Sequence, residues 1–305
     1  MKVILMGTPP FAVPSLDRLI KSNNHQVVSV FTQQPKAKDR GLKETKSPVH
    51  VLADSNNIPV YTPENLKNIA VVDLIASISA DIIVVVAYGF IIPKIVLTLK
   101  HYGCLNIHPS SLPKYRGAAP LQRTIINGEH TTAVCIMQMN EGLDTGDIIL
   151  KENISVAPNI TLNSLHDQCA SLGAELLIKA LDNIDFLLPY PQSEQGISYA
   201  HKLTKEEAKV KWHESAYQIN CKVRGMNPWP GVYFEYNNKV IKILEANYLD
   251  TQHNSIIGQV LDDQLTIACG KGILMITKLQ QSNKKAMHTE DFLRGTPIPK
   301  GAKLQ

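Results

Sequence analysis

Three short apolar runs, alternating with segments of helical spacing, constrain the fold of this chain most. They are residues 2–6 (KVILM), 25–32 (HQVVSVFT) and 81–86 (DIIVVV). Continuous runs of β-branched residues of this length are typical of strands buried on both faces of a parallel sheet. Apolar residues recur at helical spacing in the segments 11–19 and 64–79. The alternation of strands and helices predicts an α/β fold with a doubly wound, mostly parallel sheet.

The turn after the first run argues against one common use of such a fold. It reads GTPP and contains no G-x-G-x-x-G pattern. A dinucleotide site needs those glycines so that the backbone can approach the pyrophosphate closely. We therefore expect no dinucleotide at this turn.

Further segments extend the sheet and add a second domain, as expected for a chain of 305 residues. We predict strands at 58–61, 106–108, 132–139 and 147–150, and helices at 49–56, 120–127, 164–188 and from 205. Beyond residue 233, five short alternating segments (VYFEY, KVIKILEA, IIGQVL, LTIAC, GILMITKLQ) predict a small OB-type β-barrel. The polar stretch 192–199 is interpreted as part of a linker. The expected boundaries are 1–189 for the first domain, 190–204 for the linker and 205–305 for the second domain.

The composition is that of an ordinary soluble globular protein, with 44% hydrophobic and 19% charged residues. No run reaches the roughly 18 apolar residues of a membrane helix, and the start MKVILMGTPP lacks the features of a signal peptide. We expect a cytoplasmic protein without membrane contact. The five scattered cysteines form no C-x-x-C pair, so we expect buried reduced thiols and no metal site.

The stretch 104–123 (CLNIHPSSLPKYRGAAPLQR) has the composition of a functional site rather than of a packing element. Asn106 and His108 are two residues apart on a predicted strand, so their side chains share one face. Downstream, the segment 140–147 (NEGLDTGD) offers two glycines and Asp144, a candidate orienter for His108. An amide donor, an imidazole and a carboxylate can stabilise an oxyanion and move a proton during acyl transfer.

Each of these residues also has a plainer interpretation. A lone histidine at a strand end is more often structural than catalytic, and Asp144 could serve only as a turn or N-cap carboxylate. Lys114, Arg116 and Arg123 could be surface cations or could bind phosphate or carboxylate. For the segment 226–231 (MNPWPG), a rigid turn with a buried Trp is favoured over a platform for base stacking.

Charge is distributed unevenly along the chain. Residues 1–200 have a net charge of −1, residues 201–305 have +5, and the segment 33–50 alone has +3. The five basic residues of that segment are Lys36, Lys38, Arg40, Lys43 and Lys46. A basic segment and a basic C-terminal part predict a polyanionic partner.

The segments GTPPFA, NIHPS, SLPKYRGAAPLQR, GLDTGD, KLTKEEAKVKW and RGMNPWPG together resemble the methionyl-tRNA formyltransferase family over essentially the whole chain. The resemblance implies a Rossmann-like formyltransferase domain followed by an OB-type barrel. It also implies transfer of a formyl group from 10-formyltetrahydrofolate to the amino group of initiator methionyl-tRNA, by a monomer and without a metal.

The resemblance assigns roles residue by residue. The catalytic Asn, His and Asp of the family fall on Asn106, His108 and Asp144. The folate-contacting positions fall on Ser110, Ser111, Leu112 and Pro113, with pocket walls expected from Phe90, Ile91, Ile92 and the turn 140–144. The tRNA-contacting loop corresponds to residues 33–50. Two departures occur: this loop reads KAKDRGLKETK instead of a DRPAGRGKK-like run, and Asn140 stands where Asp is common.

Two other functions remain open at this point. One is a formyltransferase that acts on an amino sugar nucleotide, which would use the same Asn, His and Asp. The other is a non-catalytic tRNA-binding module on the same scaffold, against which the three residues together argue. The basic segments favour tRNA, because they suit neutralisation of phosphates along a nucleic acid.

Overall fold

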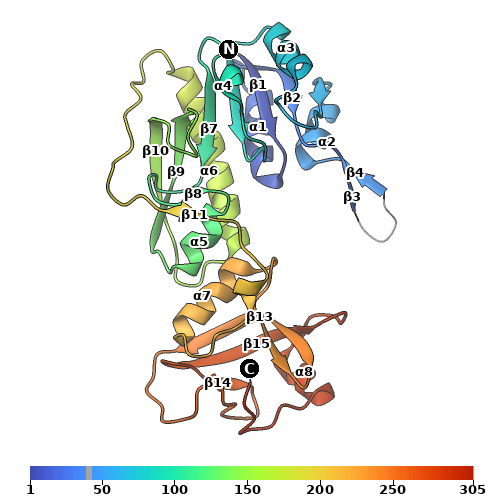
Figure 1. Ribbon diagram of the computed structural model, residues 1–305, viewed down its shortest axis with the longest axis vertical. Coiled ribbons are helices and arrows are strands. Elements are labelled where there is room, and N and C mark those ends of the chain that lie inside the picture. Colours follow the sequence, from blue (N-terminus) through green and yellow to red (C-terminus); the bar gives the residue numbers. More distant parts are fainter. Residues whose placement is uncertain (39–42, 305) are drawn as a thin grey trace. The chain divides into compact units, whose positions relative to one another are not determined.

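The computed structural model describes residues 1–38 and 43–304, and for residues 36–38 and 43 it describes the backbone alone. The chain divides into two compact units (Figure 1). The N-terminal unit holds Met1–Gly117, Thr131–Ser155 and His166–Tyr199, and the C-terminal unit holds Ala118–His130, Val156–Leu165 and Ala200–Gln305. The chain therefore passes from one unit to the other several times.

A seven-stranded sheet forms the centre of the N-terminal unit, with the strand order β10-β9-β7-β6-β1-β2-β5. Its strands are β1 (Lys2–Gly7), β2 (Gln26–Phe31), β5 (Val60–Tyr61), β6 (Ile82–Val86), β7 (Cys104–His108), β9 (Thr131–Gln138) and β10 (Ile148–Ser155). The pairs among β5, β2, β1, β6 and β7 are parallel, whereas β9 and β10 pair in antiparallel fashion. The predicted mostly parallel, Rossmann-like sheet is confirmed.

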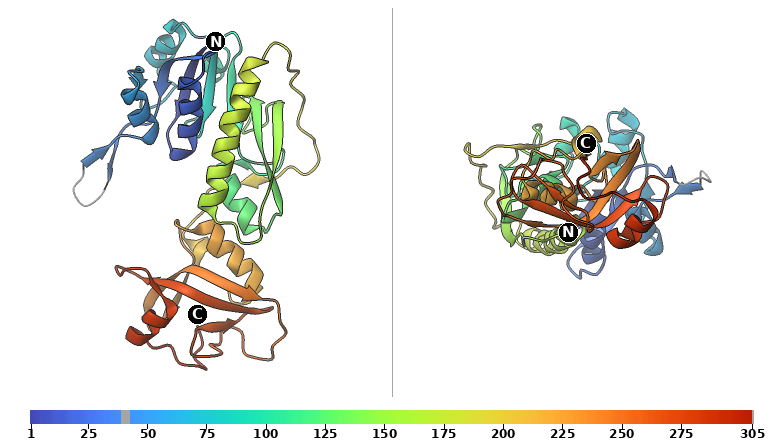
Figure 2. Two further views of the ribbon diagram at one scale, coloured as in Figure 1. Left: turned by 180° about the vertical axis from the view of Figure 1, so that it is seen from behind. Right: turned by 90° about the horizontal axis from the view of Figure 1, so that it is seen from below.

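Helices cover both faces of the sheet. Successive side chains of each strand point to opposite faces, so each strand contributes to both. They are α1 (Val13–Ile20), preceded by the 3-10 turn η1 (Pro10–Ala12), α2 (Pro48–Ser55), α3 (Ile69–Ser77), α4 (Lys94–Leu97) and α6 (Leu162–Asp182). Ile83 and Val85 of β6 belong to one apolar cluster with Val72 of α3 and Val96 of α4. On the other face, Gly173 lets α6 approach Ile107 of β7. Figure 2 shows α6 lying along the sheet in its left view.

The helix expected at 64–79 spans Ile69–Ser77, and the one expected from residue 205 begins at Ala216, after a 3-10 turn at Glu206–Ala208. Two further boundaries differ from the prediction for physical reasons. The helix expected to end near residue 188 ends at Asp182, and the apolar side chains of Phe186 and Leu188 beyond it are exposed. Strand β10 continues to Ser155, past the expected end at 150, because its outer residues are mostly exposed and need no apolar pattern. In the segment 33–50, the short strands β3 (Lys36–Lys38) and β4 (Lys43–Thr45) pair with each other.

The C-terminal unit is built on one five-stranded antiparallel sheet that forms a half-barrel. Its strands are β12 (Tyr233–Tyr236), β13 (Lys239–Leu249), β14 (Thr266–Ala268), β15 (Ile273–Gln281) and β16 (Met287–His288). Residues 256–261, predicted as a strand, form only isolated bridges at Gln259 and Val260. The two-residue strand β16 was too short to be predicted. The expected OB-type architecture is confirmed as a partly open barrel.

The C-terminal unit also contains helical segments. They are α5 (Pro120–Ile126), the 3-10 turn η2 (Glu206–Ala208), α7 (Ala216–Met226) and α8 (Thr289–Gly295). Helix α7 begins with a capping box, in which Ser215 and Gln218 each accept from the other's backbone N–H. A Cβ at Gly225 of α7 would lie 2.8 Å from Ile126, so the glycine allows α7 to pack closely against α5. The short strands β8 (Arg116–Gly117) and β11 (Tyr199–Ala200) form a separate pair where the chain passes between the units.

All five cysteines are buried and free, as predicted. Burial raises the pKa of the Cys104 thiol to about 12 and that of Cys135 to about 11. These thiols therefore stay protonated at physiological pH and serve as small core side chains. Among the described residues, no helix is both long and apolar enough to cross a bilayer.

Candidate active site

Strand β7 positions the first two candidate residues. Cys104 at its start belongs to the apolar cluster that packs against α3 and α4. Side chains alternate along a strand, so Asn106 and His108 point to this same face, as the sequence predicted. In the sheet, Asn106 lies between Val85 of β6 and Met137 of β9.

His108 is buried, with 4% of its surface exposed, and its two ring nitrogens have different neighbours. Nε2 lies 3.0 Å from the backbone oxygen of Tyr115. A carbonyl can only accept, so Nε2 carries a proton and donates it. Nδ1 lies 3.6 Å from Oδ2 of Asp144, which is longer than a hydrogen bond. The imidazole and the carboxylate therefore stand side by side, and a reacting group can lie within reach of both.

Asn106 has unused hydrogen-bonding capacity. Its Nδ2 donates to the backbone oxygen of Val85 at 3.1 Å, which uses one of two amide hydrogens. Its Oδ1 is buried and has no hydrogen-bond partner among the described residues. A buried acceptor without a partner costs roughly 1–3 kcal/mol, so a water molecule or a ligand group that donates to this oxygen would bind favourably.

Asp144 is held in a constrained turn between β9 and β10. Its backbone has a φ of 51°, in the left-handed region that non-glycine residues seldom occupy. Its Oδ2 accepts the backbone N–H of Gly117 at 2.7 Å. Within the turn, Oδ1 of Asn140 accepts from the backbone N–H of Gly142 and from the hydroxyl of Thr145. The Asp144 carboxylate thus accepts a hydrogen bond from another loop, so it does not serve only as a turn or N-cap residue.

Most of the four residues expected to contact folate have buried side chains, and the Ser110 hydroxyl is hydrogen-bonded within its own loop. Ser110 is fully buried, and its hydroxyl donates to the backbone oxygen of Lys114 at 2.6 Å. Leu112 packs into a cluster on β9 and β10, and Pro113 is buried as well. Ser111 is the one with a half-buried side chain. A ligand at this loop would meet mainly Ser111 and backbone atoms.

The expected pocket walls carry exposed apolar side chains. Ile91 is 85% exposed and Leu143 is 61% exposed, whereas Ile92 is buried and Phe90 packs edge-on against the Tyr88 ring. Lys94, two residues beyond the first expected wall, forms an ion pair of 2.7 Å with Glu141 of the turn. The chain just after residues 90–92 therefore lies beside the turn 140–144.

The basic residues of the segment 33–50 are described only in part. Arg40 lies outside the described residues, and the side chains of Lys36, Lys38 and Lys43 are not described. Lys46 forms an ion pair with Asp54, in which both side chains are about half exposed. Part of the Lys46 charge is therefore already compensated.

Other candidates from the sequence have structural partners. The Arg116 guanidinium is buried and donates twice to Oε1 of Gln192. Arg123 forms an ion pair with Glu207. These two arginines are not free surface cations. The predicted burial of Trp229 is wrong, because this side chain is 54% exposed.

Gln192 and Ser198 contact the site and were not predicted. The Ser198 hydroxyl accepts the backbone N–H of Tyr115 at 2.9 Å, and its carbonyl accepts that of Arg116 at 2.9 Å. Both residues lie in the segment interpreted as a linker, which has no apolar period or motif. No sequence pattern could have singled them out.

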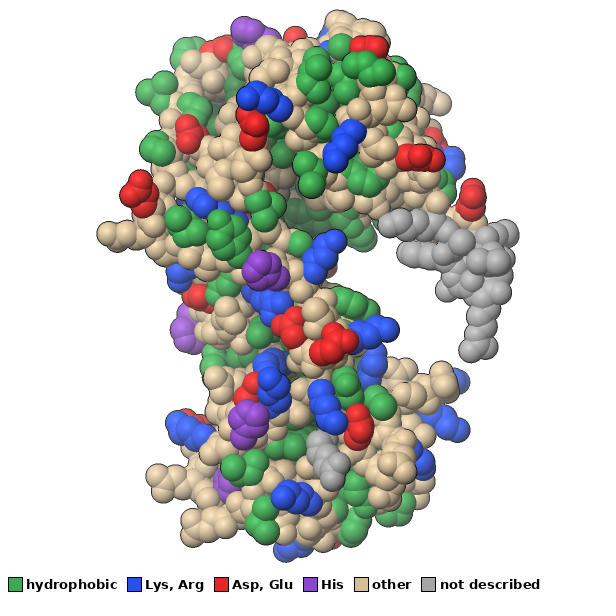
Figure 3. Space-filling model, viewed as in Figure 1, with side chains coloured by type: hydrophobic (Ala, Val, Ile, Leu, Met, Phe, Trp, Pro, Cys, Tyr) green, Lys and Arg blue, Asp and Glu red, His purple; other side chains and the backbone are tan. Residues whose placement is uncertain are grey.

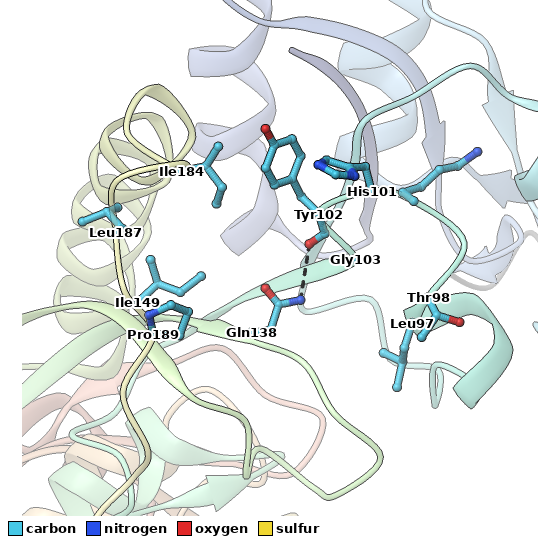
Figure 4. Close-up of a pocket in the computed structure, with 11 residues that line it drawn as sticks. Leu97, Thr98, His101, Tyr102, Gly103, Gln138, Ile149, Ile184, Leu187 and Pro189 are labelled. Atoms are coloured by element: carbon cyan, nitrogen blue, oxygen red, sulfur yellow. Dashed lines mark hydrogen bonds between the residues drawn. The ribbon is translucent and has the colours of Figure 1, made fainter.

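A separate hollow of about 440 Å³ lies at the other end of β7 (Figure 4). It is lined by residues that precede β7, including Tyr102 and Gly103, and by Ile184, Leu187 and Pro189 beyond α6. Gln138 donates to the backbone oxygen of Tyr102 at its floor. Since His108 ends the strand that Gly103 precedes, this hollow is distinct from the candidate active site.

Models of known protein families match most of the chain. The family model "Formyl transferase" matches residues 1–181, and "Formyl transferase, C-terminal domain" matches residues 202–297. The methionyl-tRNA formyltransferases of Rickettsia bellii and Rickettsia conorii are 64% and 61% identical to this chain, with full coverage of both chains in each case.

Solved structures share the fold at lower identity. An N-formyltransferase from Helicobacter canadensis, in complex with folinic acid and dTDP-3-aminofucose, is 21% identical with a TM-score of 0.70 over 90% of this chain and 99% of its own. A methionyl-tRNA formyltransferase from Clostridium thermocellum is 18% identical with a TM-score of 0.59 over 83% and 95%. From the two family models and the full-length relatives, the chain belongs to the formyl transferase family and, within it, to the methionyl-tRNA formyltransferases.

Proposed function

We propose that the protein transfers the formyl group of 10-formyltetrahydrofolate to the amino group of initiator methionyl-tRNA, with Asn106, His108 and Asp144 as its catalytic residues. The observation that carries this proposal is the juxtaposition of three groups. Nδ1 of His108 lies 3.6 Å from Oδ2 of Asp144, and the same face of β7 carries Asn106, whose Oδ1 has no partner among the described residues.

The hydrogen bond that Asn106 already forms determines which of its polar atoms can contact the substrates. The donor folate supplies the formyl group, and negative charge develops on the formyl oxygen as the amine attacks. The second amide hydrogen of Asn106 is available to stabilise that charge, because the first is used by Val85. One such donor is worth roughly 3–4 kcal/mol in comparable acyl-transfer sites. The free Oδ1 of Asn106 can accept a hydrogen from the attacking amine and so orient its lone pair.

Proton movement falls to His108 and Asp144. The Nε2–H of His108 is committed to the Tyr115 carbonyl, so Nδ1 is the nitrogen that can exchange a proton in the site. Asp144 stands beside Nδ1, and the Gly117 N–H holds its carboxylate in place. The pair can take up the proton that leaves the amine and pass it to the folate nitrogen. The bond between that nitrogen and the formyl carbon then breaks, and tetrahydrofolate leaves. A positioned acid or base of this kind contributes typically 10²–10⁴-fold to the rate.

Folate binding is proposed for the space between the segment 90–94 and the turn 140–144. Exposed Ile91 and Leu143 offer apolar surface for a flat ring, and the exposed ion pair between Lys94 and Glu141 links the two segments. The loop of Ser110, Ser111, Leu112 and Pro113 has most of its polar atoms bonded internally, which would make it a preformed wall. A solved relative of the same fold is described with folinic acid, which supports a folate derivative as ligand.

For tRNA, we propose phosphate contacts from the segment 33–50 and from the C-terminal unit. Residues 201–305 carry a net charge of +5. Figure 3 shows basic side chains spread over the face of the C-terminal unit that it draws. Such surfaces attract nucleic acid through counterion release. We further propose that the protein is a cytoplasmic monomer, and light scattering would then report one chain per particle.

An amino sugar nucleotide is the second candidate acceptor. It is favoured by the fold shared with the enzyme described in complex with dTDP-3-aminofucose. The full-length relatives at 61–64% identity and the basic C-terminal part support tRNA instead.

A formyl-transfer assay with methionyl-tRNA and with a dTDP-amino sugar tests both acceptors. We expect activity with methionyl-tRNA alone, and loss of that activity in His108→Ala and Asp144→Asn. His101→Ala and Asp147→Asn are matched controls, because both side chains are exposed and Asp147 lies close to Asp144 in sequence. Transfer to the amino sugar alone, or near wild-type turnover in His108→Ala, would contradict the proposal.

A further inference from the structure

Gln192 connects two loops of the N-terminal unit through one amide group. Its Oε1 accepts from Nε and Nη2 of Arg116, at 3.1 and 2.7 Å. Its Nε2 donates to the backbone oxygens of Asp144 and Gly146, each at 2.8 Å. Both polar atoms of this side chain are therefore used, each of them twice.

The partners allow only one orientation of this amide. A guanidinium can only donate and a backbone carbonyl can only accept, so Oε1 must face Arg116 and Nε2 must face the turn. Arg116 is 7% exposed, which shields its bonds to Gln192 from water. A glutamate at this position would keep the contact with Arg116, but it would bring carboxylate oxygen against two carbonyl oxygens.

The four hydrogen bonds of Gln192 help to fix the position of Asp144. The left-handed backbone of Asp144 is costly unless its surroundings hold it. Gln192 binds the carbonyl of Asp144 itself and the carbonyl two residues later. Its other end binds Arg116, the residue before Gly117, whose N–H donates to the Asp144 carboxylate. Gln192 thus fixes the donor and the acceptor of that hydrogen bond relative to each other.

Ser198 holds the neighbouring loop from the same segment of chain. Its hydroxyl and carbonyl accept the N–H groups of Tyr115 and Arg116, and its own N–H donates to the Pro113 carbonyl at 3.3 Å. The Tyr115 carbonyl in turn accepts from His108. The segment 192–198 therefore supports the partners of both His108 and Asp144.

We propose that Gln192 is a positioning residue for catalysis, which holds the Asp144 carboxylate at its distance from His108. The proposal rests on the catalytic role of Asp144 proposed above. Gln192 itself need not touch either substrate. Displacement of a catalytic group by about 1 Å can cost on the order of a hundredfold in rate.

The test measures kcat and KM for formyl transfer to methionyl-tRNA by full-length variants. Gln192→Glu is expected to lower kcat roughly ten- to a hundredfold, with KM for methionyl-tRNA close to that of the wild type. Gln192→Ala should give a similar loss of kcat, and it takes the place of Gln192→Glu in the test if that variant fails to fold. Gln195→Ala, an exposed glutamine in the same segment, is the matched control and should behave as wild type.

A double-mutant cycle with Asp144→Asn decides whether Gln192 acts through Asp144. Once Asp144→Asn has removed the carboxylate, adding Gln192→Glu should cost little more. Full additivity, or wild-type kcat in both Gln192 variants, would overturn the proposal while leaving the role of Asp144 intact. Near wild-type activity in Asp144→Asn alone would instead overturn both the catalytic assignment and the positioning role that depends on it.

Discussion

A methyl group at residue 146 should disable the site without touching a substrate. In Gly146→Ala, the new Cβ would lie 1.6 Å from the backbone oxygen of Gln138 at the end of β9. Real Cβ contacts are essentially never shorter than 3.0 Å, so the turn must move by at least the difference, 1.4 Å. Gln138 pairs with Leu105 of β7 within the sheet, so the turn is the part that moves.

The displacement is large enough to break the contact that holds Asp144. A shift of that size would take its 2.7 Å bond to Gly117 well past hydrogen-bond range. A hydrogen bond to a charged group is worth about 1.5–3 kcal/mol, and about 2.7 kcal/mol corresponds to a hundredfold in rate. We therefore expect single-turnover formyl transfer to fall on the order of a hundredfold.

The control for this experiment is Gly295→Ala. A Cβ at Gly295 would meet no atom within 4 Å. This residue lies in a helix, where alanine is favoured over glycine by roughly 0.5–1 kcal/mol, so activity should be unchanged and stability equal or higher. Turnover of Gly146→Ala within about twofold of the wild type would refute the claim that the placement of this turn limits the rate.

Three further perturbations have expected outcomes. Ile91→Ser combined with Leu143→Ser should weaken binding of a non-reactive folate analogue by about tenfold or more, without changing the melting temperature, since both side chains are already exposed. The control is Ile256→Ser, at an exposed residue of the C-terminal unit. If the double variant binds the analogue as tightly as the wild type, these two side chains do not line the folate pocket. Replacing the basic residues of the segment 33–50 (Lys36, Lys38, Arg40, Lys43 and Lys46) by Ala should reduce the dependence of log affinity for methionyl-tRNA on log salt by about 0.7–0.9 per lost phosphate contact, with folate binding unchanged; an unaltered slope would mean that tRNA docks elsewhere. The pKa of His25 lies below its ordinary value because burial disfavours the imidazolium more than Asp182 favours it, so the unfolded chain takes up a proton that the folded chain does not. Its stability contribution is therefore complete above about pH 6.5 and is lost as the pH falls below that value; urea unfolding should show this loss in the wild type and a flatter profile in His25→Gln, and parallel profiles would contradict the argument.

The sequence predicted the sheet well because burial leaves a local signal. The run at Ile82–Val86 is apolar throughout because all five residues of β6 are buried. The shared face of Asn106 and His108 also followed from strand geometry alone. In contrast, the outer half of β10 lies at a sheet edge, where polar and apolar residues serve equally well.

Contacts between residues that are far apart in the sequence leave no local pattern from which they could be predicted. Gln192 reaches Asp144 across 48 positions through an amide that any surface glutamine also carries. Trp229 was expected to be buried within a rigid turn, but it is 54% exposed. The positive φ of Tyr115 and Asp144 likewise depends on tertiary partners, since neither residue type favours that conformation strongly enough to predict it.

The packing of α5 against α7 has a consequence for synthesis of the chain. Helix α5 ends at Ile126, whereas α7 begins at Ala216. At roughly 5–20 residues per second, the ribosome takes several seconds to make the partner of α5 after α5 itself has emerged. During that interval Ile125 and Ile126 lack the surface that Gly225 later brings against them. The nascent chain should therefore bind a chaperone most strongly while residues between α5 and α7 are being added, and release it when α7 is complete.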